Sequence, residues 1–270
     1  MTGVRLAFSS CPNDTFVFHA WTHGVIADAP PVEVTYADID VTNTAAERGE
    51  FDVVKVSYAA LPWLLDKFAL LPTGGALGRG CGPLVLTRGD VDSIDGRTIA
   101  VPSQRSTAYL LFRLWAAGRR PSRIEVVPFA QIMPGVRDGL FDAGLVIHEA
   151  RFVYPQFGLT SLVDLGAWWE HDTGLPIPLG AILAARPLDA ARLTEVVRAS
   201  VEYAWAHPDA SRDYVATHAA EMSSDVQQRH IDLYVNEFTR DLGDEGYAAA
   251  DALLARAAAE GLVPKAPRLR

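Results

Sequence analysis

The chain has 270 residues, of which 49% are hydrophobic and 21% charged, and its formal net charge at pH 7 is −9. This composition is typical of a globular protein with one large domain or two moderate ones. The acidic balance argues against a nucleic-acid partner, and no run of about 18 apolar residues predicts a membrane span. The N-terminus has the pattern of a strand rather than of a secretory signal, so we expect a cytoplasmic protein with reduced Cys11 and Cys81.

The first part of the chain predicts alternating strands and helices. Apolar or alternating runs predict strands at 4–9, at 32–39 and from residue 51 onward. Pro12 near its start and Gly24 at its end mark the first helix, and a short second helix covers 42–50. This order of elements implies a parallel sheet.

A second α/β unit follows. Its strands are expected at 82–89, within 92–102, at 123–129 and at the end of 133–151, which begins as a helix. Another helix is expected from its N-cap Ser106 to Gly118. The segment 179–187 has the pattern of a strand that returns to the first unit, and the chain after residue 188 predicts about four helices.

Two α/β units, a returning strand and a helical tail predict two lobes around a cleft. We assign residues 1–88 and 186–270 to the larger lobe, and 89–185 to the smaller one. Ligands of open α/β sheets bind outside the carboxyl ends of the strands. The loops to consider are therefore 9–14, 40–43, 56–59, 103–108 and 147–151.

Several of these loops carry polar groups whose role the pattern leaves open. The loop from Ser9 to Thr15 and the segment 103–108 either bind a polar or anionic ligand or only cap the helices that follow. Lys55 is either directed at an anion or solvated. Ser57 is either a ligand-binding residue or a helix cap.

His148 follows an apolar strand, and it is either a general base or an ordinary packed histidine. Arg151 is suited to hold a carboxylate. The other histidines show no metal-ligand spacing, and we expect neither a metal nor an organic cofactor.

Four segments together carry a resemblance: SSCPNDTFVFHAW, KVSYAAL, STAYLLF and DAGLVIHEARFVY, which begin at residues 9, 55, 106 and 142. In this order they resemble the 1,4-dihydroxy-6-naphthoate synthases of menaquinone biosynthesis, and the resemblance spans residues 1 to about 240. It implies a fold like that of type II periplasmic-binding proteins and a lyase acting on cyclic dehypoxanthine futalosine.

The resemblance also implies roles for individual residues. It makes His148 the catalytic base, and it places the substrate-binding stretches at Lys55, Val56, Ser57, Thr107 and Ala108. It brings Asn13, Asp14 and Asn43 near the cleft. The expected partner is a small carboxylate substrate, with the chain a monomer or a homodimer.

Two alternatives remain open at this stage. Chorismate dehydratase of the same pathway has a similar fold, although the CPNDTF and HEARF segments favour the synthase. A solute-binding or sensor protein would share the fold and bind without turnover.

Overall fold

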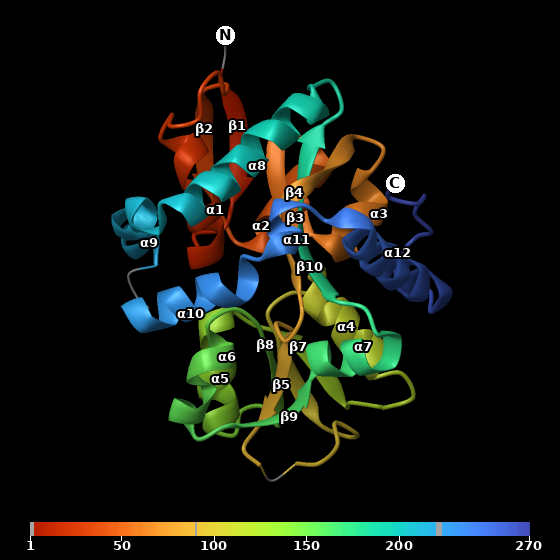
Figure 1. The fold of residues 1–270 in the computed structure, drawn as a ribbon. Helices are drawn as coiled ribbons and strands as arrows, with labels where there is room; N and C mark the ends of the chain where they lie inside the picture. Colours follow the sequence, from red (N-terminus) through yellow and green to blue (C-terminus); the bar gives the residue numbers. More distant parts are fainter. Residues whose placement is uncertain (1–2, 90, 220–222) are drawn as a thin grey trace.

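The computed structural model describes residues 3–89, 91–219 and 223–270, and it places two five-stranded sheets one below the other (Figure 1). The first sheet has the order β2-β1-β3-β10-β4 and the second the order β7-β6-β8-β5-β9. The strands of the first are β1 Val4–Phe8, β2 Val32–Tyr36, β3 Val53–Ser57, β4 Phe68–Gly78 and β10 Ile177–Ala185. Those of the second are β5 Leu84–Thr87, β6 Thr98–Val101, β7 Arg123–Val126, β8 Ala143–Val146 and β9 Thr160–Asp164.

Each sheet combines a parallel core with antiparallel strands. β1 runs parallel to β2 and β3, and β6 runs parallel to β7 and β8, as the alternation of strands and helices predicted. β10 is antiparallel to both β3 and β4, and β5 is antiparallel to β8 and β9. Each sheet therefore contains the predicted parallel strands together with antiparallel ones, because β10 and β5, which enter their sheets from the other lobe, run in the reverse direction.

Helices cover both sheets and form the C-terminal tail. The predicted N-cap of α4 is confirmed, because the Ser106 side chain accepts a hydrogen bond from the Tyr109 N–H. Among the described residues, none of the helices combines the length and the apolar content needed to cross a bilayer. The helices are α1 Pro12–Thr22, α2 Ile39–Arg48, α3 Leu61–Leu64, α4 Thr107–Trp115, α5 Phe129–Arg137, α6 Ala150–Val153, α7 Leu165–Thr173, α8 Ala190–Ala206, α9 Arg212–His218, α10 Ser224–Tyr234, α11 Glu237–Arg240 and α12 Gly243–Ala259, with 3-10 turns at Tyr58–Ala60, Tyr154–Phe157 and Pro208–Ser211.

The chain passes between the two sheets twice, once between β4 and β5 and once between β9 and β10. The lobe limits expected from the sequence, 1–88 with 186–270 and 89–185, differ from this in two places. β5 lies in the second sheet although it precedes residue 89, and β10 lies in the first sheet although it precedes residue 186. Each of these two strands directly follows a crossing of the chain between the lobes. The local sequence pattern does not mark where the chain crosses.

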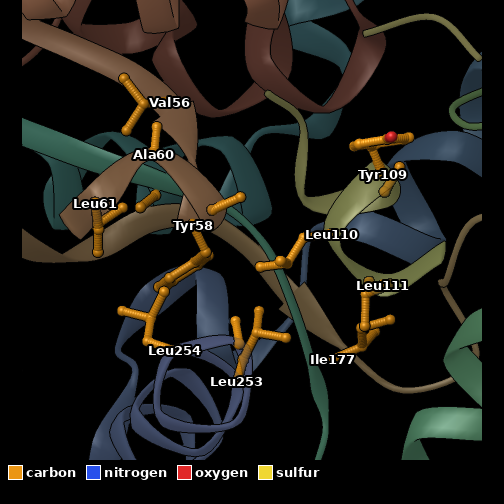
Figure 2. Packing of buried hydrophobic residues seen from close by; sticks show 14 of the residues in the cluster. Val56, Tyr58, Ala60, Leu61, Tyr109, Leu110, Leu111, Ile177, Leu253 and Leu254 are labelled. Atoms are coloured by element: carbon orange, nitrogen blue, oxygen red, sulfur yellow. The ribbon is translucent and has the colours of Figure 1, made fainter. Parts of the chain in front are cut away.

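One buried apolar cluster joins the two lobes. Figure 2 shows Tyr58 and Leu61 of the first lobe close to Leu253 and Leu254 of α12, with Leu110 of α4 on the other side. α4 belongs to the second lobe, since its N-terminus follows β6. Because burial of this shared core stabilises both lobes at once, it also holds them together on this side of the molecule.

Candidate active site

A cavity lies between the lobes, at the carboxyl ends of β1, β3 and β8 and beside the N-terminus of α4. It is lined by seven residues that the sequence predicted: Asn13, Asp14, Lys55, Ser57, Thr107, Ala108 and His148. Ser9, from the candidate loop before the first helix, also lines it, together with residues that were not predicted, among them Cys81, Leu179, Gly180, His230 and Tyr234. The rule that ligands bind at strand ends therefore locates the cavity correctly.

On the first-lobe side, Asp14 is the centre of a buried polar cluster. Its carboxylate accepts hydrogen bonds from the Ser9 hydroxyl at 2.7 Å and from the Asn13 amide at 2.8 Å, and it forms an ion pair with Lys55. The Asp14 and Lys55 residues are only 1% and 6% exposed. We call Ser9, Asn13, Asp14 and Lys55 the carboxylate cluster, and its charges cancel within it.

Gly180 on β10 makes room for the Lys55 side chain. A Cβ atom at this position would lie 2.8 Å from the Lys55 Cε atom, closer than van der Waals contact allows. The small residue therefore lets the lysine extend over β10 toward Asp14.

Asn43 does not line the cavity but forms hydrogen bonds with Ser57, which does. It is fully buried, its carbonyl oxygen accepts from the Ser57 N–H at 2.8 Å, and its amide donates to the Ser57 hydroxyl at 3.1 Å. The same amide donates to the Arg105 carbonyl at 3.3 Å, so Asn43 also connects α2 with the second lobe. Its role is therefore to position Ser57 at the cavity wall.

Thr107 and Ala108 form the first turn of α4, on the second-lobe side of the cavity. The Thr107 hydroxyl donates to the Leu179 carbonyl at 2.8 Å and accepts from the Ala59 N–H at 3.3 Å, which fixes the turn against the first lobe. The first N–H groups of a helix have no intrahelical acceptor and carry the positive end of the helix dipole. This turn is suited to hold a carboxylate.

Besides Asn43, two further predicted site residues do not line the cavity. Val56 belongs to the apolar core shared by the lobes and is absent from the described lining of the cavity, because successive side chains of a strand face opposite sides of the sheet. The Arg151 guanidinium pairs with Asp164 and donates to the Gly82 carbonyl at 2.8 Å, and it is absent from the described lining of the cavity. Their expected contact with substrate is not supported by these positions.

His148 reaches the cavity from the loop after β8. Its backbone φ is +54°, a left-handed conformation that a non-glycine residue adopts at a cost of about 1–3 kcal/mol. Its Nδ1 atom lies 3.6 Å from the Cys11 sulfur, and its ring lies edge-on to Phe129. Burial disfavours the charged imidazole, but Cys11, Glu149 and Asp14 favour it more strongly, and together they raise the pKa of His148 to about 9.

His230, which the sequence did not single out, lies beside His148. The two rings are nearly parallel with centroids 6.1 Å apart, and His230 is 1% exposed. Burial, with help from His148 and Lys55, lowers the pKa of His230 well below its usual value. In the sequence, the helical spacing of His230 with Val226 and Tyr234 could have indicated that it lies on the buried face of α10.

Comparison with known proteins places this chain in a family. Residues 4–259 match a family model described as menaquinone biosynthesis. A 1,4-dihydroxy-6-naphthoate synthase of Streptomyces coelicolor is 64% identical over 97% of this chain and 95% of its own length. Another from Thermus thermophilus is 46% identical over 99% of this chain and 98% of its own.

Solved structures share the fold of this chain. Protein AF1704 from Archaeoglobus fulgidus superposes with a TM-score of 0.89 and 32% identity, covering 97% of this chain and 98% of that one. The periplasmic aliphatic sulphonate binding protein of Escherichia coli superposes with a TM-score of 0.70 at 15% identity, covering 100% of this chain and 91% of that one. The latter likeness shows that the fold is of the periplasmic-binding-protein kind, as expected. The chain therefore belongs to the menaquinone biosynthesis family, and within it to the 1,4-dihydroxy-6-naphthoate synthases.

Proposed function

We propose that the protein is a lyase that converts cyclic dehypoxanthine futalosine into 1,4-dihydroxy-6-naphthoate, with His148 as the general base. The observation that carries the proposal is the placement of His148. A strained backbone conformation brings this imidazole to the wall of the cavity between the lobes, and such strain is characteristic of functional sites.

The chemistry follows from the groups that line the cavity. The neutral imidazole of His148 removes a proton from the sugar-derived part of the substrate, and its raised pKa makes it a stronger base whenever it is neutral. The cleavage releases the sugar-derived fragment as the second product, and formation of the aromatic naphthoate supplies the driving force. Ser57 and the N–H groups of Thr107 and Ala108 hold the substrate carboxylate or the oxygen on which charge develops.

The carboxylate cluster supports this arrangement without taking part in proton transfer. Asp14 already accepts from Ser9 and Asn13 and is paired with Lys55, so its role is to fix the loop that precedes α1. We further propose that the reaction needs no cofactor and takes place in the cytoplasm, with the chain as a monomer or a homodimer.

The experiment is an assay of the purified protein with cyclic dehypoxanthine futalosine, followed by detection of 1,4-dihydroxy-6-naphthoate by chromatography and mass spectrometry. Stoichiometric formation of the product supports the proposal. A protein that leaves this substrate unchanged but dehydrates chorismate would instead be the neighbouring enzyme of the pathway. Saturable binding of the substrate without any product would make it a binding protein.

A further inference from the structure

Three residues beside the cavity form a second constellation, which we call the histidine cluster: Cys11, His148 and His230, of which the two histidines line the cavity. They come from the loop before α1, the loop after β8 and the middle of α10, so their distances along the chain give no recognisable metal motif. One ligand-type atom from each lies within 4.8 Å of the others. The fold therefore brings together a set that sequence spacing could not reveal.

The distance between Cys11 and His148 already matches that between two ligand atoms of a metal ion. The Cys11 sulfur and His148 Nδ1 are 3.6 Å apart. A tetrahedral zinc ion with bonds of about 2.3 Å to sulfur and about 2.0 Å to nitrogen separates those ligand atoms by about 3.5 Å. Because the three ligand atoms lie within 4.8 Å of one another, the two distances to His230 have to shorten by at most about 1.5 Å for all three to reach one ion.

His230 provides independent evidence that the histidine cluster binds a ligand. Among the described residues, neither of its ring nitrogens has a hydrogen-bond partner, although the side chain is 1% exposed. Leaving such a polar group buried and unpaired costs about 1–3 kcal/mol. A metal ion at the cluster would use the lone pair of one of these nitrogens.

The charges around the cluster permit a cation. Lys55, the buried lysine that lines the cavity, is paired with Asp14, so its charge is balanced. A thiolate and two imidazoles are the donors that zinc-type ions prefer, whereas magnesium and calcium require oxygen ligands.

We propose that Cys11, His148 and His230 form a binding site for one thiophilic divalent cation of the zinc type, and that its occupation inhibits the enzyme. On binding, the Cys11 thiol and the protonated His148 imidazole each lose a proton to solvent, and the fourth coordination position faces the cavity. With Nδ1 bound to the metal, the other ring nitrogen of His148 carries the ring proton and cannot accept another. The inhibitory half of the proposal rests on the proposed role of His148, whereas the binding half does not.

Binding is tested on the full-length protein freed of metal by a chelator. Titration with Co²⁺ should give tetrahedral ligand-field bands and a thiolate-to-cobalt charge-transfer band that saturate at one ion per chain. Cys11→Ser should abolish the charge-transfer band, and His230→Ala should weaken Zn²⁺ affinity in calorimetry by at least about tenfold. The exposed His171 provides the control, because His171→Ala should leave both titrations unchanged. Absence of the charge-transfer band, or equal Zn²⁺ affinity in the Cys11→Ser variant, overturns the site.

Inhibition is tested separately by turnover assays. Zn²⁺ should inhibit in competition with substrate, a chelator should restore activity, and Mg²⁺ at the same concentration should have no effect. Full turnover by the zinc-loaded protein, or activation of the metal-free protein by Zn²⁺, overturns the inhibitory half. If no substrate is turned over at all, the proposed function fails while the Co²⁺ titration still decides the binding site.

Discussion

The two polar clusters at the cavity differ in how completely their members are partnered. In the carboxylate cluster, Asp14 accepts from Ser9, Asn13 and Lys55, and no charge is left unbalanced. In the histidine cluster, His148 has a long contact with Cys11, and neither ring nitrogen of His230 has a partner among the described residues. Groups that satisfy one another hold the loop before α1 in place, whereas groups left unsatisfied are free to meet a proton, a substrate or a metal.

Replacement of His148 tests this difference between the two clusters most directly. Asparagine tolerates the left-handed conformation at this position, so His148→Asn removes the proposed base while keeping the loop. We expect kcat to fall by about 10²- to 10⁴-fold with little change in thermal stability. The measurement is steady-state turnover, with the unfolding temperature as the control. Turnover close to that of the unchanged protein would mean that another group is the base.

The carboxylate cluster should respond in the opposite way, through stability. Asp14→Asn leaves Lys55 buried without its counter-charge, and we expect the free energy of unfolding to fall by about 3–5 kcal/mol in urea titrations. The double variant Asp14→Asn with Lys55→Met removes both charges and should recover much of this loss. A single variant as stable as the original protein would show that the pair contributes little to the fold.

Asn43 provides a milder test of positioning. In Asn43→Ala the Ser57 N–H loses its acceptor within a buried environment, which costs about 1–3 kcal/mol of unfolding free energy. Because Ser57 then loses its fixed orientation, KM should rise as well. Asn43→Asp keeps the acceptor for the Ser57 N–H and should preserve more of the stability than alanine does. Equal losses in the two variants would contradict this role of the carbonyl oxygen.

The pH dependence of turnover tests whether His148 of the histidine cluster acts as the general base. His148 must be neutral to accept a proton, and its pKa is raised to about 9, so the active fraction grows as pH rises. In chelator-treated buffer we expect kcat/KM to increase about tenfold per pH unit below this value and to level off above it. A profile that is flat between neutrality and pH 9 would contradict the general-base assignment.

How far the sequence predicts this molecule depends on how local each feature is. Ser106 caps α4 as expected because an N-cap is a matter of adjacent residues. β4 escaped prediction because Pro72, Gly74 and Gly75 lie within it, and such residues weaken the pattern of a strand. β9 and the helix α7 after it, Leu165–Thr173, also escaped, since neither was recognised between the two better-marked strands that flank them.

The same distinction applies to the site. Strand ends located Lys55, Ser57 and His148, because the carboxyl edge of a sheet follows from the order of its elements. The period of two along β3 would have excluded Val56, since Lys55 and Ser57 face the cavity and the residue between them cannot. His230 could not be placed, because only the packing of the tail across both lobes brings α10 to the cavity.

The smallest expected effect concerns Arg151, whose predicted contact with the substrate carboxylate the structure does not support. Its guanidinium holds Asp164 and the Gly82 carbonyl where the chain passes from the first lobe to the second. Both side chains are partly exposed, at 20% and 24%, so solvent screens the pair and Arg151→Met should lower the unfolding free energy by only about 1 kcal/mol. KM should change by less than about twofold, whereas loss of a bidentate carboxylate contact would raise it far more, by about tenfold or beyond. Comparison with Arg151→Lys, which keeps the charge but not the planar fork, separates the two cases. A large rise in KM for the methionine variant, largely relieved in the lysine variant, would show that Arg151 binds the substrate. A group outside the two clusters would then also act in the site.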